Sequence, residues 1–174
     1  MFIIYGEENS GKTHTAWLVL IKLLASNGIT DVKMDPTMEI VSEQDVKNDI
    51  RQSNGDHKKA KLRDFRVLLT YIDKKVAIIS AGDHLKEENG SVTSFIDSLE
   101  WANRYQADYI VCCSRSRNRK GSVCQYIMGN YKQAVCEWYY KDKTNKLEDQ
   151  VNDAKKVAGE VFRDINNLTQ DIKN

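Results

Sequence analysis

An eight-residue stretch near the start of the chain, GEENSGKT from Gly6 to Thr13, has the residue types and spacing of a phosphate-binding loop. Its two glycines would let the backbone approach phosphate oxygens without a Cβ in the way. The amides that follow would point inward at the start of a helix, where the helix dipole favours anions. The nucleotide-binding residues are therefore predicted to be Gly6, Asn9, Ser10, Gly11, Lys12, Thr13 and His14.

Two side chains of this stretch are expected to do more than bind. The Lys12 ammonium would reach the β- and γ-phosphates and act in catalysis, and the Thr13 hydroxyl would bind Mg²⁺. Glu7 and Glu8 are expected to point to solvent, because two carboxylates facing the cavity would repel the phosphates.

The flanking residues support this interpretation. Phe2 to Tyr5 predicts a short buried strand, and Thr13 to Ser26 predicts an apolar helix that ends at Asn27-Gly28. Strand, glycine-rich loop and helix is the arrangement in which such a loop works. Through these residues the sequence resembles the P-loop NTPase superfamily, whose Walker A motif has this pattern, with no subfamily identified. The resemblance implies a nucleoside triphosphate and Mg²⁺ as ligands.

An acid near the end of a neighbouring strand usually positions the magnesium ion or the attacking water in such proteins. KKVAIISAGD offers Asp83, which is predicted to be a catalytic and metal-binding residue, with a helix cap or turn as the alternative role. The weaker candidates for the same role are Asp35, Glu39 and Asp45.

A predicted β-hairpin over Phe65–Ser80 runs into S-A-G-D, an order that resembles the layout of small GTPases. In that family D-x-x-G follows such a hairpin, and Ile79 stands here where the family has the acid. The guanine-reading motif N-K-x-D of that family is absent, and the comparable strand end reads CCSRSRN. ATP is therefore the expected nucleotide.

A basic segment, SRSRNRKGS from Ser114 to Ser122, follows a predicted strand over Tyr109 to Cys113. It should lie at the carboxyl edge of the sheet, where open α/β sheets bind ligands. Arg115 and Arg117 are predicted to be catalytic, as part of a lid that stabilises the transferred phosphoryl group. Contact with a nucleic-acid backbone and a solvated basic loop are the alternatives.

Composition indicates one ordinary globular domain spanning residues 1–174, with 41% hydrophobic and 29% charged residues and a net charge of +1. No secretory signal is visible, and no apolar run approaches the ~20 residues of a membrane-spanning helix. A cytoplasmic protein without a membrane partner is expected. The four cysteines include no C-x-x-C pair, which predicts buried thiols rather than a zinc site.

The remaining pattern predicts an α/β, three-layer P-loop domain with a mainly parallel sheet, one antiparallel hairpin and a long C-terminal helix. The hairpin joins Phe65–Ile72 to Val76–Ser80 through Asp73-Lys74-Lys75. Asp31 to Asp64 is polar and predicts a partly mobile excursion. The other predicted elements are helices over Ser42–Arg51, Val92–Tyr105 and Gly121–Tyr131 and a strand over Ala134–Tyr140.

Asn145 to Ile172 predicts one long amphipathic helix. Its apolar residues are spaced alternately four and three apart, which gives one narrow seam: Leu147, Val151, Ala154, Ala158, Val161, Ile165, Leu168 and Ile172. The seam is expected to pack across the domain's own sheet, and a homodimer through this helix is the alternative.

Three functions are compatible with these features. The first is a slow ATPase or nucleotide switch in which Asp31 to Asp64 responds to the γ-phosphate. The second is a small-molecule or nucleotide kinase with that segment as acceptor site and the basic segment as lid. The third is a non-enzymatic, nucleotide-dependent adaptor that dimerises through its C-terminal helix. No acceptor-binding motif is visible, which disfavours the kinase.

Overall fold

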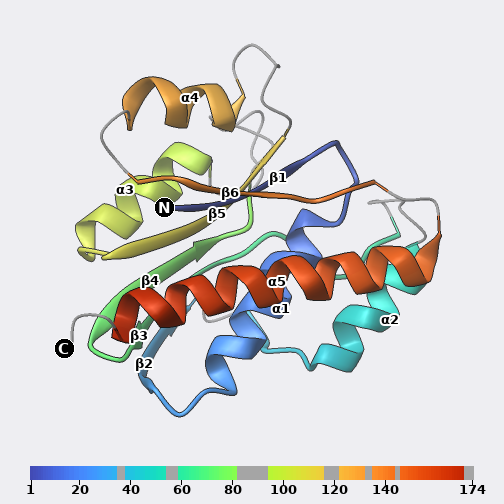
Figure 1. Ribbon diagram of the computed structural model, residues 1–174, viewed down its shortest axis with the longest axis horizontal. Coiled ribbons are helices and arrows are strands. Elements are labelled where there is room, and N and C mark those ends of the chain that lie inside the picture. Colours follow the sequence, from blue (N-terminus) through green and yellow to red (C-terminus); the bar gives the residue numbers. More distant parts are fainter. Residues whose placement is uncertain are drawn as a thin grey trace.

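The computed structural model describes residues 1–34, 38–53, 59–81, 94–115, 122–131, 135–143 and 146–170. These residues form an α/β fold with one mixed sheet of six strands and five helices (Figure 1). The strands are β1 (Phe2–Gly6), β2 (Ile29–Met34), β3 (Arg66–Tyr71), β4 (Lys74–Ile79), β5 (Tyr109–Arg115) and β6 (Glu137–Tyr140).

The sheet has the order β2-β3-β4-β5-β1-β6. β1 pairs in parallel with β5 and β6, and β5 pairs in parallel with β4. β3 is antiparallel to both of its neighbours, β2 and β4. The predicted mainly parallel sheet is confirmed. Because β3 runs against the others, the start of β3 lies at the same edge as the carboxyl ends of β1, β4, β5 and β6.

Helices cover both faces of the sheet (Figure 1). One face packs against α1 (Lys12–Leu24), α2 (Glu43–Ser53) and α5 (Leu147–Gln170), and the other against α3 (Phe95–Arg104) and α4 (Val123–Asn130). Alternate residues of one strand serve the two faces: Ile4 packs under α1, and Ile3 packs under α3 and α4. Two-sided burial explains why the strands read as unbroken apolar runs.

β2 was not predicted, because Ile29–Met34 lies at the polar start of the expected excursion. It pairs along β3 from Ile29 opposite Tyr71 to Met34 opposite Val67. As the outermost strand it is partly exposed, so polar side chains such as Asp31 and Lys33 are tolerated there. The sheet therefore contains a second antiparallel pair in addition to the predicted hairpin.

The predicted hairpin exists, but its turn lies earlier than Asp73-Lys74-Lys75. Ile72 and Asp73 form the turn, with φ of 47° and 63°. Two successive positive φ angles match the twist of a two-residue hairpin connection. Lys74 and Lys75 begin β4, where Lys75 donates its amide to the Asp108 carboxylate at 2.8 Å. Polarity alone wrongly suggested that the lysines formed the loop.

The C-terminal helix packs against its own chain, as expected. α5 lies along α1 and α2. The buried members of the predicted seam are Val151, Ala154, Ala158, Val161 and Ile165. Leu168 is 43% exposed, so the seam ends there within the part of the helix that the structure describes. A homodimer remains a prediction, and it would need a surface other than this seam.

Two further expectations from the sequence concern the cysteines and membrane-spanning helices. Cys112, Cys113 and Cys124 are buried thiols and Cys136 is a partly buried thiol, and none of the four forms a disulfide. Burial raises the pKa of Cys112 to about 12, so this thiol stays protonated. Within the described ranges, no helix combines the length and apolar character that crossing a bilayer requires.

Gly159→Ala tests the local geometry of α5. A Cβ at this helical position would meet no atom within 4 Å. Alanine should therefore raise the free energy of unfolding by about 0.5–1 kcal/mol, because it has less conformational freedom to lose. Urea denaturation measures the change.

Gly28→Ala is the matched control. Its Cβ would lie 2.6 Å from Tyr71 Cε2, so the same substitution should lower stability there. A destabilised Gly159→Ala variant would contradict the packing of α5.

Candidate functional site

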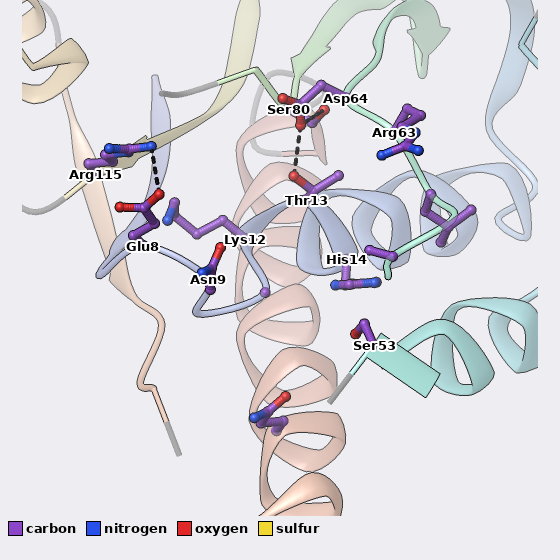
Figure 2. Close-up of a pocket in the computed structure, with 14 residues that line it drawn as sticks. Glu8, Asn9, Lys12, Thr13, His14, Ser53, Arg63, Asp64, Ser80 and Arg115 are labelled. Carbon is purple, nitrogen blue, oxygen red and sulfur yellow. Dashed lines mark hydrogen bonds and ion pairs between the residues drawn. The ribbon is translucent and has the colours of Figure 1, made fainter. Parts of the chain in front are cut away.

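A cavity of about 410 Å³ lies where the carboxyl end of β1 meets the start of α1 (Figure 2). Six of the predicted site residues line it: Asn9, Gly11, Lys12, Thr13, His14 and Arg115. The other lining residues are Glu8, Ser53, Ala60, Leu62, Arg63, Asp64, Ser80 and Gln150. Gly6 and Ser10 are buried within the same loop, and Asp83 and Arg117 lie outside the described residues.

The loop between β1 and α1 has the backbone conformation of an anion-binding nest. Asn9 and Gly11 both have positive φ, 61° and 83°. Gly11 is the N-cap of α1, so no side chain caps the amides of the first turn. Such amides are directed outward along the helix axis and carry partial positive charge. The geometry therefore suits a phosphate group.

The far side of the loop is supported by the end of β6. A Cβ on Gly6 would come within 2.3 Å of the Lys141 carbonyl oxygen, so only glycine fits at this position. The Lys141 amide donates to the Tyr5 carbonyl at 2.7 Å. The buried ammonium of the Lys141 side chain donates to the Asp153 carboxylate of α5 at 2.6 Å. The Ser10 hydroxyl is buried and has no hydrogen-bond partner among the described residues.

Lys12 and Arg115, two of the cations that line the cavity, both contact the loop. Lys12 is 7% exposed, and its ammonium donates to the Glu7 carbonyl at 2.7 Å. Arg115 ends β5, in register with Gly6, and its guanidinium contacts the Glu8 carboxylate at 3.2 Å (Figure 2). Glu7 and Glu8 are both exposed, but Glu8 lines the cavity, so the expectation that both point away from it is wrong for Glu8. The expectation missed the ion pair that Glu8 makes.

The carboxylate nearest to the Thr13 hydroxyl belongs to Asp64. Thr13 Oγ1 donates to Asp64 Oδ1 at 2.7 Å, and Ser80 Oγ donates to the same oxygen at 3.2 Å (Figure 2). Ser80 in turn accepts the Phe65 amide at 2.7 Å. The acid predicted from the sequence, Asp83, follows a strand. Asp64 precedes β3, and it reaches this edge because β3 is antiparallel.

Asp64 and Thr13 suit a magnesium ion. Two neighbouring ligands of an octahedral Mg²⁺ ion are about 2.9 Å apart when each Mg–O distance is about 2.05 Å. The 2.7 Å between Thr13 Oγ1 and Asp64 Oδ1 is close to that value. No group of three or more His, Cys, Asp or Glu side chains in the described part of the chain could hold a metal alone. Phosphate and water oxygens would have to complete the shell.

The weaker acidic candidates do not line the cavity where they are described. Asp45 instead forms a reciprocal cap with Ser42 at the start of α2. Its amide donates to Ser42 Oγ at 3.1 Å, and its carboxylate accepts the Ser42 hydroxyl at 2.6 Å and the Ser42 amide at 2.9 Å. Glu39 is exposed and absent from the cavity wall. Asp35 lies outside the described residues.

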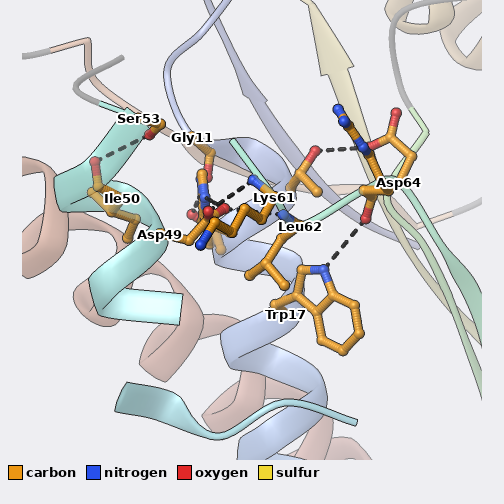
Figure 3. A network of polar contacts seen from close by, with 12 residues as sticks. Gly11, Trp17, Asp49, Ile50, Ser53, Lys61, Leu62 and Asp64 are labelled. Atoms are coloured by element: carbon orange, nitrogen blue, oxygen red, sulfur yellow. Dashed lines mark hydrogen bonds and ion pairs between the residues drawn. The ribbon is translucent and has the colours of Figure 1, made fainter. Parts of the chain in front are cut away.

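A buried polar network lies beside the cavity and ties α1 to α2 (Figure 3). His14 Nε2 and Asp49 Oδ2 are 2.9 Å apart. Asp49 also accepts the amides of Lys61 at 2.8 Å and Leu62 at 3.1 Å. Trp17 Nε1 donates to the Arg63 carbonyl at 3.4 Å. The segment that leads into Asp64 is thus held from two sides.

The network favours a neutral imidazole beside a charged carboxylate. Burial lowers the pKa of His14, although the contact with Asp49 opposes the shift. Burial raises the pKa of Asp49, but the hydrogen bonds from Lys61, His14 and Leu62 together bring it below its usual value. His14 therefore lines the cavity as a neutral hydrogen-bonding group.

The lowered pKa of His14 makes stability depend on pH. Below 6.5, the ordinary pKa of the group, the unfolded chain binds more protons than the folded one, so acid favours unfolding. The stabilisation that the neutral His14 ring provides is complete above pH 6.5. It is lost as the pH falls toward the pKa of His14 in the folded protein. His14→Gln removes it, so the loss of unfolding free energy between about pH 7.5 and about pH 5.5 should be smaller than in the wild type. Urea denaturation at both pH values measures this loss, and equal losses would contradict the assignment.

A scan against protein-family models, a search of curated proteins and a search of solved structures each gave no match to this chain.

Proposed function

We propose that the protein is a P-loop nucleoside triphosphatase that binds a nucleoside triphosphate with Mg²⁺ in this cavity and hydrolyses it slowly. One observation carries the proposal. The loop of the phosphate-binding motif, the Thr13–Asp64 pair and Arg115 all line one cavity. ATP is the proposed nucleotide, because the guanine-reading motif is absent from the sequence.

The phosphates would lie against the amides at the start of α1, where the left-handed loop backbone and the helix dipole both favour anions. The Lys12 ammonium already projects to the inside of the loop, where it contacts a carbonyl group. A phosphate oxygen is a stronger acceptor for this cation than a neutral carbonyl. Binding would therefore transfer the ammonium to the phosphate chain.

Thr13 and Asp64 would hold the magnesium ion. Bound there, the ion would neutralise charge on the terminal phosphates during hydrolysis. The Thr13 hydroxyl would turn its proton away from Asp64 and present its lone pair to the metal. Asp64 would keep its place through Ser80, which donates to the same carboxylate oxygen.

The same contacts support a nucleotide switch. The residues before Asp64 are held by Asp49 and Trp17 independently of Thr13. Among the described contacts of this segment, the hydrogen bond from Thr13 to Asp64 is the one that a bound metal would break. A change in this contact would act first on residues 59–64, between α2 and β3. These residues belong to the segment predicted to respond to the γ-phosphate, Asp31 to Asp64.

Lys12→Ala tests the nucleotide site. The variant should bind MgATP about 100-fold more weakly than the wild type and should lose phosphate release, because a charge-assisted contact to the phosphates disappears. Isothermal titration calorimetry and a phosphate-release assay measure the two effects.

Lys22→Ala is the control, since it removes the same charge from the last turn of the same helix. It should retain both properties. Equal binding by the wild type and Lys12→Ala would refute the phosphate assignment.

Asp64→Asn tests the metal site. The amide keeps an oxygen that can accept the Thr13 hydroxyl, so the fold should persist. We expect binding of ATP with Mg²⁺ to weaken about ten-fold, with binding of ATP in EDTA unchanged, because a neutral ligand holds Mg²⁺ less well. Calorimetric titration with and without Mg²⁺ compares it with Asp31→Asn, an exposed acid of β2. The metal assignment is wrong if the two variants behave alike.

A further inference from the structure

Glu8 and Arg115 form an ion pair across the mouth of the phosphate loop (Figure 2). Their side chains come from different elements, the loop after β1 and the end of β5. The Arg115 side chain is 17% exposed and the Glu8 side chain is 52% exposed. Both line the cavity. The less exposed partner is the cation, so it has fewer alternative contacts with water than the carboxylate has.

The position of Arg115 suggests which phosphate it would meet. At the edge of the sheet β5 lies between β1, which carries the phosphate loop, and β4, which ends next to Ser80. Ser80 and Thr13 both contact Asp64. If a phosphate chain extends from the loop toward the Thr13–Asp64 pair, its terminal phosphate would therefore lie next to Arg115.

We propose that Glu8 competes with the terminal phosphate of a triphosphate for Arg115 and thereby sets the selectivity of the site between triphosphates and diphosphates. A guanidinium matches a carboxylate and a phosphate with the same planar arrangement of donors. The terminal phosphate can replace the Glu8 carboxylate at Arg115 through side-chain movement alone, because pairing with Gly6 fixes the backbone of Arg115. Water would solvate the released Glu8 carboxylate, since that side chain is already half exposed.

This inference rests on the proposed function and adds a residue that the phosphate-binding motif does not specify. A diphosphate has no terminal group at this position, so it would leave the Glu8–Arg115 pair intact. Removal of the Glu8 charge should therefore favour triphosphates specifically. A general repulsion between acidic residues and phosphates would instead affect both nucleotides.

The test compares Glu8→Gln with Glu7→Gln, which removes the same charge from the neighbouring position and leaves the Arg115 contact in place. Calorimetric titrations with MgATP and MgADP are made for the wild type, both single variants, Arg115→Gln and the Glu8→Gln/Arg115→Gln double variant. Thermal unfolding of each variant verifies that it is folded.

Glu8→Gln should bind MgATP about five-fold more tightly than the wild type. Its affinity for MgADP should change by no more than that of Glu7→Gln. In the Arg115→Gln background the added Glu8→Gln change should give no gain specific to MgATP, because the guanidinium for which it competes is gone.

The outcomes separate the two proposals. Three results would overturn the competition: no difference between Glu8→Gln and Glu7→Gln, equally tighter binding of ATP and ADP by Glu8→Gln, or an effect of Glu8→Gln that persists without Arg115. Wild-type ATP binding would still support the nucleotide site in each case. If the wild type binds no nucleotide and Lys12→Ala behaves identically, the proposed function fails, and the competition fails with it.

Discussion

The hydrogen bond from Thr13 to Asp64 joins the two halves of the cavity. One half is continuous in sequence, since β1, the glycine-rich loop and α1 follow one another directly. The other half includes Asp64 and Ser80, which flank the β3–β4 hairpin, and both reach the loop because β3 runs against the remaining strands. The chemistry proposed for the site needs both halves, so it depends on the sheet as much as on the motif.

Sequence reasoning succeeded where the information was local. Apolar runs placed β1, β4 and β5, helical periodicity placed α1 and α5, and the glycine spacing placed the loop. It failed where tertiary pairing overrides local polarity. β2 is half exposed at the edge of the sheet, and the two lysines after Asp73 belong to a strand. Asp64 was missed for the same reason, because nothing near it in sequence reveals which way β3 runs.

The acidic and basic groups around the cavity differ in how firmly they are held. Asp49 receives His14 and two backbone amides in a buried setting, where loss of any partner would leave a charge without compensation. The Glu8–Arg115 pair is partly exposed, and water can solvate the Glu8 carboxylate when the pair separates. The buried network therefore fixes the shape of the cavity wall, and the exposed pair is free to adjust to a ligand.

The contact between Gly6 and the Lys141 carbonyl has a consequence for the order of folding. Ile3 pairs with Cys112 on one side and with Trp138 on the other, so β1 lacks both neighbours until β5 and β6 have been synthesised. Contacts this distant in sequence slow the search for the native topology. On the ribosome, the glycine-rich segment would emerge before β5 and β6 but acquire its final shape only after them, so the proposed nucleotide could not assist the earlier stages of chain collapse.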